Sequence, residues 1–369
     1  MEFKKYLKSH FYNSRGYYTA DPIVVIESDD WGSQRVASKQ IQDELLKKGL
    51  LKNNAYNKYD SLETAIDIEN LCDVLSSIKN AAGKSPVFTA NFIMENPDYD
   101  KIRANQFSKF ESENFEKSYL RLESQSKTKY FIDKAVDEQL IFPQFHGLIH
   151  LQRFRWLSDL QKNNPKLRKA FDLEFYGFGK NELNPRGYLA AFDADSKSEL
   201  FEIAEDIQNG AETFKQHFNF YSGTIIPPQN TLHTSLKLKL SSSNFFGIQG
   251  ARVVKMKPLN PKEPTQIKRF SGIDKQSGLV NVVRNVTFEP SSDPINGIDQ
   301  AMSEIKIAFQ WNRPAVICTH RVNYISRLDP KNGSRGLGML KELLDRVVAS
   351  YPEVRFMSSQ ELATLIMKS

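Results

Sequence analysis

Short apolar runs alternate along the chain with stretches whose apolar residues recur three and four positions apart. The apolar runs have the length of buried strands, and the other stretches have the period of amphipathic helices. Predicted strands cover residues 22–28, 86–94, 139–146, 220–230, 278–290, 313–321 and 353–358. Predicted helices cover residues 38–49, 61–83, 150–162, 196–218, 297–311 and 358–368, with Ser38 and Ser61 as the first residues of two of them.

This order of strand, helix and strand predicts an α/β fold with a parallel sheet. Seven or eight such units favour a distorted (β/α) barrel, TIM-like and seven- or eight-stranded, over an open sheet. Two long polar and aromatic segments, near 98–138 and 160–195, interrupt the pattern and are expected to be helical insertions. Since no linker is visible, we expect a single domain over residues 1–369.

Composition and charge narrow the classes of function. The 369 residues carry a net charge of +6, and their basic residues are scattered, so no nucleic-acid partner is expected. Cys72 and Cys318 are the only cysteines, which argues against a disulfide framework and against a zinc knuckle. Because neither a signal peptide nor an apolar run of about 18 residues is seen, we expect a cytoplasmic protein without a membrane span. The oligomeric state stays open.

Polar residues gather where the predicted strands end. Asp29 and Asp30 follow the first strand, and His146 ends a later one, with His150 four residues on. Pro227, Pro228, Gln229 and Asn230 end another strand, and His320 ends a late one. In parallel α/β barrels the carboxyl ends of the strands form the rim at which active sites are assembled.

Each pattern also has an ordinary structural explanation. Aspartates after a strand often cap a helix or form a turn, and His320 by itself is explained equally well as a hydrogen-bonded rim residue. His146 and His150 would share one helical face and bind a divalent ion, or they would form local hydrogen bonds. It is the combination of these motifs, in this order, that favours a catalytic site.

The combination resembles the polysaccharide deacetylase family (carbohydrate esterase family 4), whose members have a distorted barrel and one metal ion. "SDDWG" (residues 28–32) is similar to its Asp-Asp-Gly motif, with Trp31 inserted before Gly32. "HGLIH" (146–150) is similar to its His-Ser/Thr-x-x-His motif, and "VICTH" (316–320) to its last strand. The resemblance implies Asp29 as general base, Asp30, His146 and His150 as metal ligands, and His320 as general acid.

Two family motifs are altered. "TIIPPQN" (224–230) keeps the proline pair but lacks the arginine that precedes it in the family, so the base loses its orienting cation unless Arg284 or Arg321 supplies it. The fourth motif, which normally contains an aspartate, has no clear counterpart. Arg284, Asn285 and Glu289 are loose candidates.

The ligand set implied by the resemblance suits one divalent metal ion, with Zn²⁺ favoured and Co²⁺, Ni²⁺, Mn²⁺ or Fe²⁺ as alternatives. We expect a hydrolase that removes acetyl groups from N-acetylated or O-acetylated sugars or polysaccharides. The residues expected to contact substrate are Trp31, Pro228, Gln229, Asn230 and Arg284, and Trp156 and Phe145 would either line an apolar wall or pack in the core. Two alternatives remain: a hydrolase of small cyclic amides, and a non-catalytic, metal-containing carbohydrate-binding protein.

Overall fold

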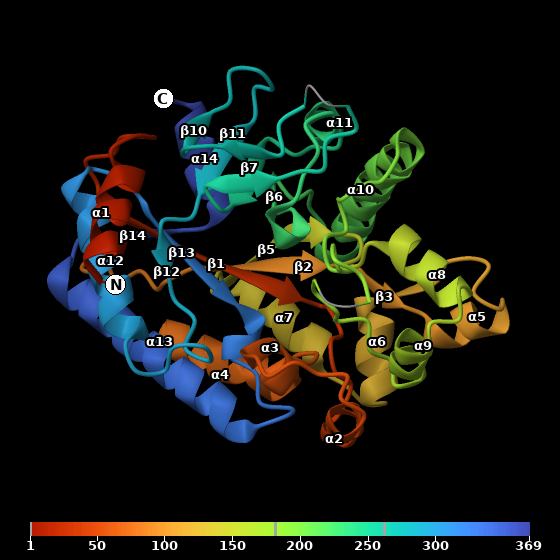
Figure 1. Cartoon of the computed structure of the whole chain (residues 1–369). Coiled ribbons are helices and arrows are strands. Elements are labelled where there is room, and N and C mark those ends of the chain that lie inside the picture. The colour runs from red at the N-terminus through yellow and green to blue at the C-terminus, as the bar shows by residue number, and fades with distance from the viewer. Residues whose placement is uncertain (1, 181–182, 261–262) are drawn as a thin grey trace.

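A largely parallel sheet forms the centre of the protein (Figure 1). The structure, a computed structural model, describes residues 2–180, 183–260 and 263–369. The ten strands of the main sheet are β1 (Ile23–Trp31), β2 (Phe88–Ile93), β5 (Ile141–Gly147), β6 (Thr224–Ile225), β7 (Gly247–Gly250), β10 (Gly272–Ile273), β11 (Val280–Val283), β12 (Val286–Thr287), β13 (Ala315–His320) and β14 (Arg355–Met357). Two short hairpins pair β3 (Glu95–Pro97) with β4 (Ser112–Asn114) and β8 (Val253–Lys255) with β9 (Gln266–Lys268).

The sheet closes on itself through one divided strand. The strand order is β10-β11-β7-β6-β5-β2-β1-β13-β12, and only Arg284 and Asn285 separate β11 from β12. The Arg284 amide donates to the Gly250 carbonyl on one side, and the Asn285 amide donates to the Val316 carbonyl on the other. The same stretch of chain therefore joins both ends of the sheet, which confirms the predicted α/β barrel with a parallel sheet.

Alternation along β1 separates the inside of the barrel from the helix layer. Val24 and Ile26 pack in the large apolar cluster with side chains of the surrounding helices, whereas Ile23 and Val25 pack with residues of β11, β14 and the C-terminal helix, residues 359–367. Because strand side chains alternate between faces, Glu27 and Asp29 share the inner face with Val25. Two carboxylates on one strand thus point into the barrel.

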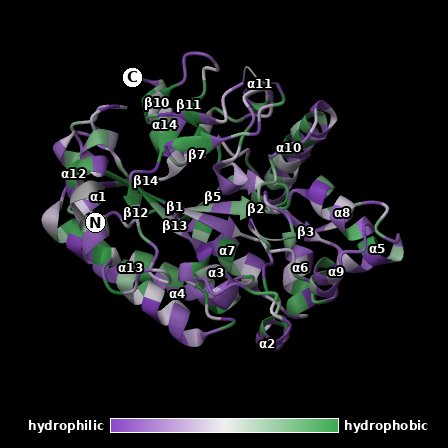
Figure 2. Cartoon of the chain, in the orientation of Figure 1, coloured by the Kyte–Doolittle hydropathy of each residue, from purple (hydrophilic) through white to green (hydrophobic). Residues whose placement is uncertain are grey.

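The helices are amphipathic and cover the strands. They are α1 (Glu2–Asn13), α2 (Lys39–Lys47), α3 (Ala55–Tyr59), α4 (Ala65–Ser76), α5 (Tyr99–Ala104), α6 (Phe115–Leu122), α7 (Thr128–Asp137), α8 (Arg153–Gln161), α9 (Pro165–Asp172), α10 (Lys197–Phe218), α11 (Leu236–Ser242), α12 (Gly297–Gln310), α13 (Pro330–Ser350) and α14 (Ser359–Met367), with 3₁₀ turns η1 (Pro228–Asn230) and η2 (Arg321–Asn323). Figure 1 shows α12, α13, α4 and α7 along one side of the central strands. Figure 2 shows hydrophilic residues scattered along these helices.

Several element boundaries differ from the sequence-based prediction. The predicted helix 61–83 begins at Ala65, because Thr64 rather than Ser61 is its N-cap and forms a capping box with Asp67. The predicted strand 278–290 is divided at Arg284. The predictions also missed β7, whose four residues include two glycines and give little strand signal.

Helix α13 approaches the end of β13 closely at Gly336, and this approach gives a stability prediction. A Cβ atom at Gly336 would lie 1.7 Å from the backbone oxygen of Asn323 in η2. Since a backbone atom cannot move aside cheaply, we expect Gly336→Ala to lower the free energy of unfolding by about 3 kcal/mol. Gly338→Ala, in the same helix with nothing within 4 Å of its Cβ position, is expected to raise it by about 0.5–1 kcal/mol.

Urea unfolding of both variants checks this pair, since midpoints that shift at unchanged slope report stability alone. Equal urea midpoints for the two variants would mean that the Asn323 backbone does not lie close enough to Gly336 to exclude a Cβ atom.

No helix in the described ranges is both long enough and apolar enough to cross a bilayer.

Candidate metal and catalytic site

Asp30 leaves the regular geometry of β1. The register between β1 and β2 shifts between Ser28 and Trp31, and Asp30 has a left-handed φ of 75°. A bulge of this kind redirects a side chain, and left-handed backbone in a non-glycine residue costs about 1–3 kcal/mol. Asp29 keeps the inner face of the barrel, whereas Asp30 is turned toward β5. The bulge therefore gives two adjacent carboxylates two different sets of neighbours.

His146 and His150 meet Asp30 from the end of β5 and the loop that follows it. Their Nε2 atoms lie 3.4 and 3.3 Å from the same oxygen, Asp30 Oδ1. The expected helical face is wrong, because Gly147 has a φ of 128° and turns the chain, and α8 begins only at Arg153. His146 and His150 are therefore joined by an irregular loop and do not lie on one turn of a helix.

This cluster has the chemistry of a metal site. Its three ligand atoms lie within 4.8 Å of one another, and the residues Asp30, His146 and His150 are buried. His146 Nδ1 lies 2.9 Å from the Ile226 carbonyl, which only accepts hydrogen bonds, so Nδ1 carries the proton and the Nε2 lone pair faces the carboxylate. Burial lowers the pKa of His150 to about 4, so this imidazole is neutral. One anionic oxygen and two imidazole nitrogens fit a divalent transition metal ion.

Arg284 holds Asp29, in place of the arginine that is missing from the "TIIPPQN" segment. Arg284 donates to both Asp29 oxygens at 2.7 and 2.6 Å and to Glu27 at 2.6 Å, and Asn91 donates to Asp29 at 2.9 Å. Burial would raise the pKa of Asp29, but the Arg284 charge outweighs it and lowers the pKa to about 2. Arg284 thus comes from the divided strand, whereas Arg321 is bound by Asp60 and Glu63.

His320 faces Asp29 across the site. Its Nε2 lies 3.7 Å from Asp29 Oδ2, and its Nδ1 lies 2.6 Å from Glu289 Oε1. Burial opposes protonation, but Glu289 and Asp29 together raise the pKa of His320 well above its ordinary value. Asn323 donates to the other oxygen of Glu289 at 2.7 Å and holds it in place. Glu289, a loose candidate in the sequence, is therefore the carboxylate that orients His320.

One cavity of about 250 Å³ joins these groups. Its lining residues are Asp29, Asp30, Arg35, Tyr56, His146, His150, Pro227, Gln229, Asn230, Lys255 and His320. Sequence reasoning missed Arg35, Tyr56 and Lys255, because none of them follows a predicted strand. Gln229 and Asn230 reach the cavity wall through left-handed backbone, with φ of 56° and 49°. The Asn230 side-chain oxygen accepts the Ala251 amide at 2.7 Å, so it also fixes the loop.

Three expected substrate contacts need correction. Trp31 is 1% exposed and packs against Phe88 and Phe92 with its Nε1 bound to Ser28, because the bulge turns it into the helix-facing core. Pro228 is buried and lies outside the cavity lining, where Pro227 stands instead. The Arg284 side chain is 5% exposed and bound to two carboxylates, so it positions Asp29.

The aromatic wall that Trp156 and Phe145 would form is absent as well. Both side chains have no exposed surface, and Phe145 packs on Phe214 and Phe245 while Trp156 packs on Phe171. Their ordinary explanation, core packing, is the one that the structure supports.

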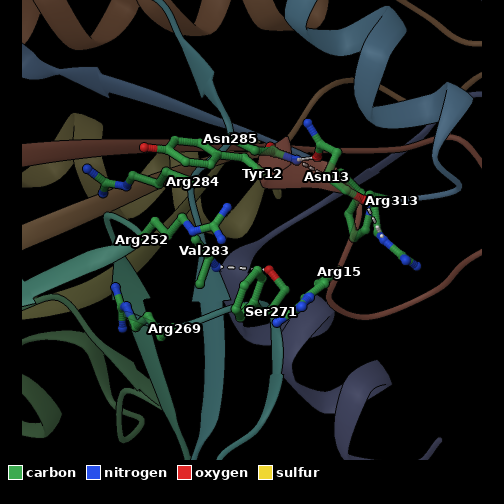
Figure 3. Close-up of a pocket in the computed structure, with 12 residues that line it drawn as sticks. Tyr12, Asn13, Arg15, Arg252, Arg269, Ser271, Val283, Arg284, Asn285 and Arg313 are labelled. Carbon is green, nitrogen blue, oxygen red and sulfur yellow. Dashed lines mark hydrogen bonds between the residues drawn. The ribbon is translucent and has the colours of Figure 1, made fainter. Parts of the chain in front are cut away.

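Arg284 also borders a second, much smaller cavity on its other side (Figure 3). This cavity, of about 20 Å³, has room for little more than one water molecule. Arginines 15, 252, 269 and 313 line it together with Asn285, whose side chain binds Asn13 and the Pro314 carbonyl. Asn285 is therefore a structural residue at the closure of the sheet and lies outside the larger cavity.

Comparisons with known proteins give distant likenesses. No family model matches the chain, and no curated protein matches it. A 4-alpha-glucanotransferase from Thermococcus litoralis has 8% identity and a TM-score of 0.46, and the match covers 92% of this chain but only 40% of that one. A Parabacteroides distasonis protein, provisionally described as a glycoside hydrolase/deacetylase, has 11% identity, coverages of 95% and 73%, and a TM-score of 0.49.

A Mycobacterium smegmatis protein, provisionally described as a polysaccharide deacetylase, matches with 10% identity, 96% coverage of both chains and a TM-score of 0.42. Proteins described as polysaccharide deacetylases thus stand among the solved structures that this chain resembles.

Proposed function

We propose that the chain is a metal-dependent hydrolase that removes acetyl groups from N-acetylated or O-acetylated sugars. The observation that carries this proposal is the meeting of three units at one cavity: an arginine-bound carboxylate, a buried Asp-His-His cluster and a carboxylate-bound histidine. A single cavity with a base, a ligand set and an acid is what hydrolysis of an amide or ester requires.

Asp30, His146 and His150 would hold the ion, and zinc suits their donor atoms best. When bound, such an ion acidifies a water molecule and polarises a carbonyl group. The Ile226 carbonyl fixes the His146 ring through Nδ1, so Nε2 is presented to the ion without a change of tautomer. Asp30 supplies the negative charge that an imidazole ligand lacks.

Asp29 would accept the proton of the attacking water. Arg284 and Asn91 hold its oxygens and keep it ionised, so it is available as a base over the whole neutral range. His320 would then donate its Nε2 proton to the departing nitrogen or oxygen, since Glu289 holds the opposite ring nitrogen. An amine leaves only when protonated, which makes an acid at this position necessary for an amide substrate.

The surrounding space suits a substrate larger than an acetyl group. Arg35, Tyr56 and Gln229 line both the site and an adjoining cavity of about 340 Å³. Cavities that bind small molecules measure about 300–1,000 Å³, so the pair has room for a sugar unit. Leucines 50, 51 and 189 and Phe178 give this adjoining cavity an apolar side, on which a sugar face would pack.

Asp29→Asn tests the assignment of the base. We expect the variant to retain one ion per chain and to lose turnover by about 10²–10⁴-fold, since an amide cannot accept the proton. Metal content by elemental analysis and acetate release from N-acetylated oligosaccharides are the two measurements. Asp159→Asn makes the same change at a residue that binds Tyr188 away from the cavity, and is the matched control.

Turnover equal to the wild type in Asp29→Asn would remove this residue as base. A panel of cyclic amides assayed beside the acetylated sugars distinguishes the substrate classes. Binding of acetylated oligosaccharide without acetate release under any divalent metal would favour a carbohydrate-binding protein instead.

A further inference from the structure

A second group of potential metal ligands lies beside the proposed acid. Glu289, Cys318 and His320 present a carboxylate oxygen, a sulfur and an imidazole nitrogen that all lie within 4.8 Å of one another. Cys318 and His320 are two residues apart on β13 and therefore point to the same face of the strand. The pairing of Thr287 with Cys318 sets β12 in parallel register with β13, which brings Glu289 level with His320.

We propose that these three residues form a second metal site, selective for a thiophilic divalent ion such as Zn²⁺, Co²⁺ or Cd²⁺. A thiolate, an imidazole and a carboxylate together favour such ions over Mg²⁺ or Ca²⁺. Atoms that share one zinc ion at about 2.0–2.3 Å lie about 3.3–3.8 Å apart. The Glu289–His320 contact of 2.6 Å would have to open by about 1 Å, which small rotations of two side chains allow.

The three residues are partly accessible, and His320 also lines the cavity of the first site. The side chains of His320 and Glu289 are 22% and 20% exposed, and Cys318 is half-buried. Three protein ligands leave the fourth position of a tetrahedral ion to water. The first cluster differs in kind, because Asp30, His146 and His150 contain no sulfur.

Arg284 is the charge that would oppose a cation here, since its Nη1 lies 3.3 Å from Cys318 Sγ. Two carboxylates, Glu27 and Asp29, already compensate that guanidinium. Ligation also releases the thiol proton of Cys318 and one proton of the His320 imidazolium, so a dication replaces two protons. The net charge beside Arg284 is unchanged, and the guanidinium does not exclude the ion.

Occupation of this second site would switch off the reaction, an effect that rests on the proposed function. His320 would coordinate the ion through Nδ1, the ring nitrogen that faces Glu289. Its Nε2–H would then belong to a neutral ring, which is a far weaker acid than the imidazolium and a poor proton donor. Hydrolysis is therefore expected to be active with one ion per chain and inhibited when a second ion binds.

Cobalt titration of the metal-free protein tests the site without any substrate. Thiolate-to-cobalt charge transfer absorbs in the near ultraviolet, and only a site that contains a cysteine gives this band. We expect the band to appear in the wild-type protein after the first equivalent of cobalt, and to be lost in Cys318→Ala. Cys72→Ala is the matched control: it removes the other cysteine, which lies in α4, and is expected to keep the band.

Absence of the band in the wild type, or its persistence in Cys318→Ala, would overturn the proposal. If Cys318→Ala still binds one cobalt ion at Asp30, His146 and His150, the variant is folded. Glu289→Gln is a second test variant: it leaves both cysteines in place and is expected to weaken the band. If the band appears but no substrate is hydrolysed, the second site stands and the proposed function fails. If acetate is released and excess zinc does not inhibit the wild type more than Cys318→Ala, the inhibitory effect fails.

Discussion

Asp30→Asn is expected to lose the bound ion, and with it all metal-dependent turnover, while the protein stays folded. The Asp30 oxygen lies 3.4 and 3.3 Å from two imidazole nitrogens and is the anionic member of the Asp-His-His cluster. Asparagine keeps the shape of the side chain and tolerates the left-handed φ of 75°, so the bulge is preserved. Loss of a direct ligand should weaken binding by more than the ~10–100-fold that loss of a supporting residue costs.

The neighbouring carboxylate provides the control. Asp29→Asn removes the same charge one residue away and is expected to retain the ion, because Asp29 is bound to Arg284 and not to His146 or His150. Titration calorimetry with Zn²⁺ on both metal-free variants, each also carrying Cys318→Ala so that the second proposed site is removed, gives the comparison. Equal zinc affinity in the two variants would show that Asp30 is not a ligand, and the proposed hydrolase would lose its metal centre.

The sequence was sufficient to predict the candidate site where local patterns carried the signal. Each strand that ends in a candidate site residue begins with a short apolar run, and parallel strands in a barrel bring such ends to one rim. Asp30, His146 and His150 could therefore be predicted to meet although more than a hundred residues separate the first from the second. The geometry of the meeting was less accessible, because Gly147 and the bulge at Asp30 replace the helix that the His-x-x-x-His spacing suggests.

Long-range partners were harder to predict. Arg284 and Glu289 lie in the stretch where the barrel closes. The altered motif suggested Arg284 or Arg321 as the cation for Asp29, but nothing near them in the sequence decides between the two, and nothing reveals that Glu289 binds His320. Trp31 is predicted to face the cavity but lies in the core, because a shift of one residue in the strand register decides which of the two a side chain faces. Lys255 and Tyr56 stand on short elements that give little periodic signal.

Arg284→Met is expected to destabilise the protein by about 3–5 kcal/mol, the cost of leaving buried carboxylates without their partner. Glu27 has no exposed surface and Asp29 is 4% exposed, so neither can be solvated in place. Arg313→Met is the control, because Arg313 borders the same small cavity (Figure 3) but its hydrogen bonds within the described residues go to the backbone carbonyls of Asn13 and Asn312. It is expected to cost less than about 1 kcal/mol.

A double variant separates the structural effect of Arg284 from its effect on Asp29. Glu27→Gln combined with Arg284→Met removes one of the two orphaned charges, so urea unfolding should show a smaller loss of stability than in Arg284→Met alone. Turnover should not recover, because Asp29 would still lack the guanidinium that orients it. If restored stability also restored acetate release, Arg284 would serve only the fold, and the orientation of Asp29 would have to come from Asn91 alone.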